Sequence, residues 1–96
     1  MKRCYLVSYD IRDPKRLRKI FKTIKGYGHH WQYSMFLCNL SPLQRIRLVT
    51  ELHELANLNK DQILVIDLGV SEESAREAIT VIGQKLPEPM TDAIVF

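Results

Sequence analysis

The stretch CYLVSYDIRDPKRLRKIFKTIK, residues 4–25, predicts a buried strand that passes directly into an amphipathic helix. Residues 4–9 are β-branched, aromatic and mostly apolar, which is typical of a buried strand. Asp13 is a suitable N-cap and Pro14 occupies the first helical position, so we expect a helix over residues 14–25. Its buried stripe has the i, i+3, i+4, i+7 spacing and consists of Leu17, Ile20, Phe21 and Ile24.

The middle of the chain predicts further strands and a second helix. Residues 29–40 are aromatic, amide and apolar, and with a bend at Ser34 they indicate two short strands or one bulged strand. Residues 41–44, Ser-Pro-Leu-Gln, form a capping box that begins a helix ending near residues 58–59. Residues 62–68 predict another buried strand. The apolar face of the second helix consists of Leu48, Val49, Leu52, Leu55 and Ala56.

The last quarter of the chain has a weaker pattern. A serine cap predicts a short helix over residues 71–77. Residues 78–83 fit either a continuation of that helix or a strand. Pro87 and Pro89 separate this region from an apolar segment at residues 93–96, which we expect to form a terminal strand.

The order strand, helix, strands, helix, strand predicts an α+β fold, the ferredoxin-like split βαβ sandwich (βαββαβ), with an additional C-terminal strand. We expect a single domain over residues 1–96, with a core at about residues 3–69 and an extension at residues 70–96 that reaches the partner protomer. Two helices would cover one face of the sheet, and the other face would expose alternate residues of strongly apolar strands. A homodimer that stacks two sheets face to face would bury that second face.

Length and composition limit the class of protein. A chain of 96 residues with 46% hydrophobic and 26% charged residues has room for one globular domain and is not disordered. No apolar run approaches the ~20 residues that span a bilayer. The first residues lack a signal-peptide cleavage site. Cys4 and Cys38 are too few for a disulfide framework or a zinc cluster, so we expect reduced core thiols in a cytoplasmic protein.

Positive charge is concentrated at the start of the chain. Residues 1–30 contain nine Lys or Arg and two Asp, whereas residues 31–96 contain five Lys or Arg and nine Asp or Glu. The first helix presents a cationic face without an interspersed acid, formed by Lys15, Arg18, Lys19, Lys22 and Lys25, with Arg16 at its flank. This face is either an ordinary solvated helix surface or a surface that binds a phosphate backbone, and we favour the second.

Asp10 is the strongest candidate for chemistry, because its carboxylate directly follows a buried strand. It is either a turn residue that ends the strand or a metal ligand. Mg²⁺ usually takes one or two carboxylates and keeps several waters, so two copies of Asp10 that meet across a dimer axis would meet this requirement. They would hold a metal-activated water near a bound phosphodiester.

Aromatic and histidine side chains are concentrated in residues 29–36. Trp31, Tyr33 and Phe36 are able to stack on bases, but we expect them to pack in the core or a dimer interface. The adjacent histidines at 29 and 30 face opposite sides of a strand, so they are not a joint pair of metal ligands.

A series of short motifs follows the chain: Tyr-Leu-Val-Ser-Tyr-Asp-Ile at residues 5–11, the basic helix at 15–25, Gly-Tyr-Gly at 26–28, Gln-Tyr-Ser-Met-Phe at 32–36 and Ile-Gly-x-x-Leu-Pro at 82–87. This series resembles the pattern of the CRISPR-associated Cas2 family. Their order and spacing match over nearly the whole chain. The resemblance implies a ferredoxin-like homodimer whose last strand packs on the partner's sheet. It also implies a role in acquiring spacers from foreign DNA, together with the family's integrase partner, Cas1.

The same resemblance implies an endonuclease that acts on single-stranded RNA or double-stranded DNA with Mg²⁺ or Mn²⁺. By position, Asp10 would be the catalytic and metal-binding aspartate, with Tyr9 beside it and Ser34 and Phe36 in the Gln-x-Ser-x-Phe motif. Arg16 and Arg18 would be the family's helix arginines. The full set that we expect to bind nucleic acid is Arg12, Arg16, Arg18, Lys19 and Lys22.

Two departures from the family pattern keep a second function open. His30 and Trp31 stand where the family commonly has Arg-Val, and Leu37 stands where it commonly has Glu. The alternative to the endonuclease is a non-catalytic scaffold that grips DNA with its basic helices and bridges integrase subunits. A third hypothesis, a ferredoxin-like RNA-binding module of regulatory or toxin type, predicts no integrase partner.

Overall fold

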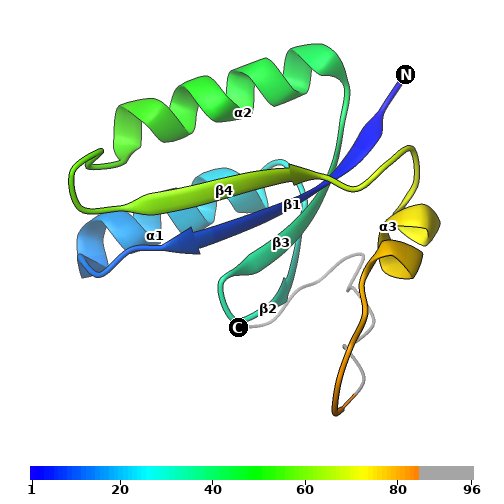
Figure 1. Ribbon diagram of the computed structural model, residues 1–96. Helices are drawn as coiled ribbons and strands as arrows, with labels where there is room; N and C mark the ends of the chain where they lie inside the picture. The colour runs from blue at the N-terminus through cyan, green and yellow to red at the C-terminus, as the bar shows by residue number, and fades with distance from the viewer. Residues whose placement is uncertain (85–96) are drawn as a thin grey trace.

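Four strands form one antiparallel sheet in the order β2-β3-β1-β4 (Figure 1). The computed structural model describes residues 1–84 of the chain. In chain order the elements are β1 (Arg3–Asp10), α1 (Pro14–Lys25), β2 (His29–Gln32), β3 (Met35–Leu40), α2 (Pro42–Leu55), β4 (Gln62–Asp67) and α3 (Glu72–Ala78). This arrangement confirms the predicted α+β fold of the ferredoxin-like type.

Both long helices begin at the predicted caps. The Asp13 side chain accepts a hydrogen bond of 2.9 Å from the backbone N–H of Arg16. At the start of α2, Gln44 N–H donates to Ser41 Oγ over 3.2 Å, and Ser41 N–H donates to Gln44 Oε1 over 2.8 Å. These contacts satisfy N–H groups that have no partner within the helix, so local sequence is enough to determine where each helix begins.

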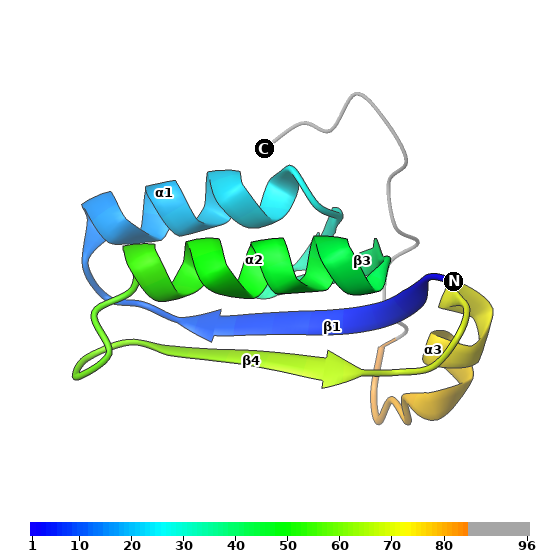
Figure 2. The ribbon, with the colours of Figure 1, turned by 90° about the horizontal axis from the view of Figure 1, so that it is seen from above.

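Helices α1 and α2 lie side by side on one face of the sheet (Figure 2). Tyr5, Val7 and Tyr9, which alternate along the central strand β1, pack into this layer. The rest of the main core comes from the turn after β1, both helices and β3: Ile11, Ile20, Ile24, Phe36, Cys38, Leu40, Leu48 and Leu52.

The short helix α3 covers part of the opposite face of the sheet (Figure 1). Its Ala75 is fully buried in a second, smaller apolar cluster with Trp31 and Leu37. The edge strand β4 remains open on this face, where Leu64 and Ile66 are 46% and 41% exposed. An apolar strip is therefore available on this face.

Helix α2 ends earlier than the predicted end near residues 58–59. Ala56 follows the last helical residue with extended dihedral angles, φ −76° and ψ 150°. The backbone N–H of Asn57 then donates to the Asp61 carboxylate over 2.8 Å. This contact joins two ends of the loop between α2 and β4, and the sequence carried no signal for it.

Both alternatives for residues 78–83 are wrong beyond Ala78. Helix α3 ends there, and residues 79–84 are neither helix nor strand. The β-branched Ile79 adopts an extended conformation that stops the helix. The expected terminal strand at residues 93–96 lies outside the described residues.

Core packing is confirmed for two of the three aromatic side chains. Trp31 and Phe36 are buried, whereas Tyr33 is 88% exposed, so Tyr33 lies outside the core of one chain and its packing in a dimer interface stays a prediction. Tyr33 lies in the two-residue turn between β2 and β3 with a φ of 45°, in the left-handed region. The turn geometry, and not side-chain hydrophobicity, determines its position.

The cysteines are free, buried thiols, as predicted. Cys38 belongs to the main core and Cys4 to the second cluster, on the other face of the sheet. Burial raises the pKa of Cys38 to about 12. Within residues 1–84, the helices are too short and too polar to traverse a bilayer.

Candidate functional site

Asp10 is the last residue of β1, and strand alternation directs its side chain away from α1 and α2. It shares a face with Leu6 and Ser8, and it pairs with Gln62, the first residue of β4. Its carboxylate is exposed and makes no hydrogen bond or ion pair within residues 1–84. Asp10 is therefore available to a ligand.

The connection from β1 to α1 and the loop from α2 to β4 lie at the same end of the sheet, on the left in Figures 1 and 2. Between them is an open cavity of about 580 Å³. Three carboxylates, three cations and one proline line it: Asp10, Asp13, Asp61, Arg12, Arg16, Lys60 and Pro14. The structure thus brings Asp10 together with Arg12 and Arg16, two of the cations predicted to bind nucleic acid.

Arg16 forms a bidentate ion pair with Asp61. Its Nε donates to Asp61 Oδ2 over 2.8 Å, and its Nη2 donates to Asp61 Oδ1 over 3.1 Å. This hydrogen bonding from Arg16, together with the N–H of Asn57, holds the pKa of Asp61 below its ordinary value. The same contact raises the pKa of Arg16. Asp61 is therefore a carboxylate anchored inside the protein, with both oxygens engaged.

Of the three carboxylates that line the cavity, one remains uncommitted and available to a metal ion. Asp13 caps α1 and Asp61 holds Arg16, which leaves Asp10. Within residues 1–84, no group of three or more His, Cys, Asp or Glu side chains is arranged to hold a metal ion. Since Mg²⁺ accepts one or two carboxylates and retains waters, Asp10 fits as half of a site shared by two copies.

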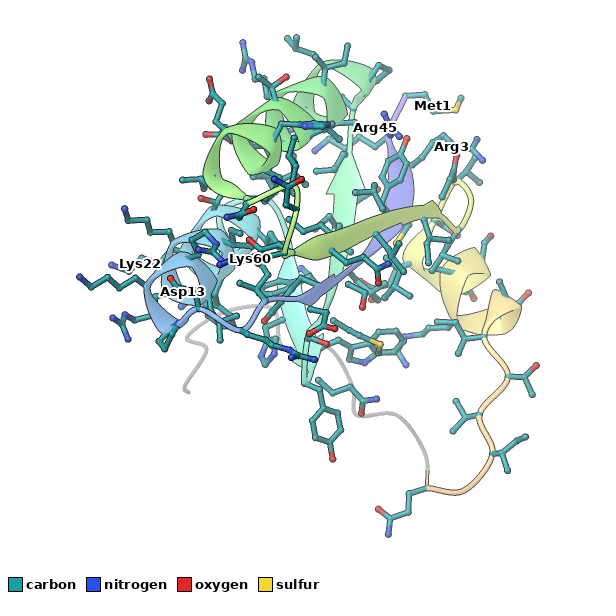
Figure 3. All side chains as sticks on the ribbon, turned by 60° about the vertical axis from the view of Figure 1, so that its left-hand side comes forward. Met1, Arg3, Asp13, Lys22, Arg45 and Lys60 are labelled. Carbon is teal, nitrogen blue, oxygen red and sulfur yellow. The ribbon has the colours of Figure 1, made fainter. Side chains whose placement is uncertain are left out.

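The remaining predicted cations lie along the exposed face of α1. Arg18 and Lys22 border a mostly apolar depression that also includes Tyr9 and Phe21. Lys19 is exposed on the same helix, and Figure 3 shows Lys22 extending outward from it. The predicted binding set is therefore split between the Asp10 cavity and the outer surface of α1.

The predicted supporting residues do not line the Asp10 cavity. Phe36 is fully buried, with its ring centroid 6.2 Å from that of Tyr9 and 5.2 Å from that of Phe21. Burial raises the pKa of Tyr9. The carbonyl of Ser34 accepts a hydrogen bond of 3.2 Å from the backbone N–H of Tyr9. These residues hold the end of β1 in place, one residue before Asp10.

Lys60 and Asp61 belong to this cavity, although the sequence patterns did not single them out. Figure 3 shows Lys60 on the same side of the molecule as Asp13. An antiparallel partner of β1 must begin where β1 ends, so the residues just before β4 lie beside Asp10. The signal was therefore present in the predicted topology, in the two charged residues that precede the strand at 62.

Comparison with known proteins connects this chain to one family. A family model described as CRISPR associated protein Cas2 matches residues 3–76. A CRISPR-associated endoribonuclease Cas2 from Geobacter sulfurreducens is 34% identical over 95 residues, which cover 99% of this chain and 99% of that protein.

Two solved structures are also similar to this chain. The crystal structure of Streptococcus pyogenes Cas2 at pH 6.5 has a TM-score of 0.69 and 25% identity, covering 83% of this chain and 99% of that one. A chain of a partial Cas6-RT-Cas1–Cas2 complex has a TM-score of 0.69 and 21% identity, with 100% of both chains covered. At 21% identity, the similarity to the chain of this complex shows a shared fold.

Proposed function

Because this chain belongs to the CRISPR-associated protein Cas2 family, we propose that it is a CRISPR adaptation protein that takes part in spacer acquisition from foreign nucleic acid. In this proposal it acts as a homodimer with a Cas1 integrase as its partner. We also propose that Asp10 forms an endonuclease site that depends on Mg²⁺ and hydrolyses phosphodiester bonds in single-stranded RNA or double-stranded DNA.

The observation that carries the enzymatic proposal is the free carboxylate of Asp10 in a cavity that also contains cations. Most carboxylates of this cavity are engaged by the protein itself, as the contacts of Asp13 and Asp61 illustrate. Asp10 is exposed and uncommitted at the end of a buried strand. A rigid strand end is well suited to hold a ligand group with the required accuracy.

The homodimer is supported by the open face of the sheet. Leu64 and Ile66 are partly exposed there, and Leu6 contributes to the same face from β1. Asp10 also points to this side, next to Gln62. A second copy packed on the face would bury the apolar strip and bring the two Asp10 carboxylates toward one another, which completes the set of ligands that one chain lacks.

The side chains of the site have distinct roles in this proposal. The two Asp10 carboxylates would hold the ion, and Arg12 would neutralise the phosphate that approaches the cavity. A bound Mg²⁺ ion would supply an activated water and neutralise charge on the phosphodiester. The exposed cations of α1 extend the contact along the backbone, which gives affinity without reading sequence.

A non-catalytic scaffold that binds DNA and bridges integrase subunits is the second candidate. The observation that favours it is that the Asp10 cavity has one uncommitted carboxylate, together with the lack of a three-ligand cluster within residues 1–84. In that function, Asp10 is a turn residue, and the cationic surface of α1 binds the DNA.

Cleavage by the wild type and by Asp10→Asn, each with Mg²⁺, Mn²⁺ or EDTA, tests the enzymatic proposal. The substrates are labelled single-stranded RNA and duplex DNA. Asp67→Asn is the matched control, because it removes a carboxylate of the same type at the other end of the sheet. We expect cleavage by the wild type and by Asp67→Asn with metal, and a loss of at least 100-fold in Asp10→Asn.

Each result supports or refutes the proposed Asp10 site. Cleavage that requires both the metal and Asp10 supports the enzyme and identifies its substrate. Equal cleavage by Asp10→Asn refutes the Asp10 site. Absence of cleavage in all three proteins, with salt-sensitive DNA binding intact, refutes the enzyme and supports the scaffold.

A further inference from the structure

The ion pair between Arg16 and Asp61 joins α1 to the loop that precedes β4, across 45 positions of sequence. The Asp61 side chain is only 1% exposed and that of Arg16 is 26% exposed. Both oxygens of the carboxylate receive hydrogen bonds from the guanidinium, at 2.8 and 3.1 Å. In the absence of nucleic acid, the guanidinium of Arg16 is therefore held by this bidentate contact with Asp61.

Asp61 also organises the loop in which it lies. Its Oδ2 accepts from the N–H of Asn57, and the carbonyl of Asn57 accepts from the N–H groups of Lys60 and Asp61 over 3.0 and 2.8 Å. The side chain of Asn57 accepts from the N–H of Asn59 over 3.0 Å. Residues 57–61 are thus a closed turn with defined hydrogen bonds, held against α1 by Arg16.

The turn presents Lys60 at the Asp10 cavity. Lys60 is exposed and lines the cavity together with Asp10 and Arg12. Within residues 1–84, its ammonium forms no hydrogen bond or ion pair. Figure 3 shows Lys60 projecting from the loop, on the side where α1 begins.

We propose that Lys60 binds a backbone phosphate at the Asp10 cavity, and that Arg16 is a positioning residue that acts through Asp61 to hold Lys60 there. The inference rests on the proposed function, because it assumes that the Asp10 cavity receives a phosphodiester backbone. It differs from the assignment implied by family resemblance, in which Arg16 itself contacts nucleic acid. An ammonium on a flexible stem is suited to this task, since a lysine acts as a point charge toward phosphate.

The dependence of the binding constant on salt concentration measures the number of phosphate contacts. Each contact adds about 0.9 to the slope of log K against log salt for duplex DNA and about 0.7 for single strands. Removal of one contact therefore weakens binding in 0.1 M salt by about eightfold for a duplex and about fivefold for a single strand. A general loss of folding would not change the slope by one such step.

The experiment measures fluorescence anisotropy of a labelled 20-base-pair DNA duplex and a 20-nucleotide RNA, in EDTA, from 50 to 300 mM KCl. We expect Lys60→Gln to reduce the slope by one contact per bound lysine. Lys2→Gln is the matched control, because it removes the same charge next to the first residue of β1, at the opposite end of the strand from Asp10. We expect less than a twofold effect from Lys2→Gln. Equal effects of the two variants would overturn the role of Lys60.

The double variant tests the role of Arg16. If Arg16 acts only through Lys60, Arg16→Gln combined with Lys60→Gln has the slope of Lys60→Gln alone. If Arg16 contacts phosphate itself, the double variant loses a further contact, and the positioning role is refuted. Thermal unfolding followed by circular dichroism confirms that each variant is folded at the assay temperature.

The binding assay and the cleavage assay fail independently. A slope that depends on Lys60 in a protein that does not cleave supports this inference and refutes the enzyme. Cleavage that depends on Asp10 but not on Lys60 supports the enzyme and refutes this inference. Binding in which neither Lys60 nor Arg16 changes the slope refutes the inference as well.

Discussion

Replacement of Gly28 by alanine tests how closely β2 packs on β3. A Cβ atom at this position would lie 2.3 Å from the carbonyl oxygen of Leu37 and 2.8 Å from the Cα of Cys38. It would also lie 2.5 Å from the sulfur of the fully buried Cys38. Since backbone atoms cannot rotate away, the hairpin must separate. We expect Gly28→Ala to lower the free energy of unfolding by about 3 kcal/mol or more.

Gly26, two residues earlier in the same Gly-Tyr-Gly motif, is the matched control. Its nearest neighbour for a new Cβ atom is the carbonyl oxygen of Thr23 at 3.4 Å, which is an ordinary contact. Its backbone is in the right-handed helical region, φ −70° and ψ −10°, where alanine is unstrained. We expect Gly26→Ala to raise the free energy of unfolding by about 0.4–1 kcal/mol, because it restricts the unfolded chain.

Urea titration followed by circular dichroism at 222 nm measures both variants, at one protein concentration so that any association contributes equally. The two changes are chemically identical, so any difference between them comes from the surroundings of each glycine. The changes in the free energy of unfolding should have opposite signs and differ by about 3.5 kcal/mol or more. In a domain of this size that separates the midpoint temperatures by roughly 15 °C or more. A difference below 1 kcal/mol would refute the argument that backbone proximity requires glycine at residue 28.

Three further predictions follow from the contacts described above. The lowered pKa of Asp61 contributes stability that is present above about pH 4 and is lost as the pH falls through the folded-state pKa. We therefore expect the free energy of unfolding of the wild type, measured by urea titration at each pH, to fall more steeply than that of Asp61→Asn between pH 5 and pH 2, and equal slopes would contradict this role of Asp61. Cys4 and Cys38 are buried and the pKa of Cys38 is about 12, so neither thiol should react with Ellman's reagent at pH 8 until denaturant is added, and rapid reaction of the native protein would contradict the burial. We expect Tyr33→Gly to raise the free energy of unfolding, measured by urea titration, by about 0.5–1 kcal/mol, because glycine adopts a positive φ without strain and the tyrosine side chain that is lost is exposed. A loss of stability would show that the tyrosine makes contacts that offset the strain.

The sequence by itself determined the elements whose signals are local. The caps at Asp13 and Ser41 place the helix starts, because they satisfy N–H groups within three residues along the chain. The apolar stripe of α1 and the apolar strand β1 follow from periodicity alone, and they are the first two elements of the βαββαβ order. Asp10 could be identified as a candidate because its position after a buried strand is also a local feature.

Only the tertiary structure decided which charged groups share the Asp10 cavity and which are committed elsewhere. Arg16 and Arg18 are both predicted to bind nucleic acid, yet Arg16 is held by Asp61 and Arg18 lies on the outer surface of α1. The partner of Arg16 is 45 residues away, and Lys60 reaches the cavity because β4 runs antiparallel to β1. Ion pairs between distant segments depend on strand order and loop closure, and these arise from burial of the whole sheet, which no local pattern encodes.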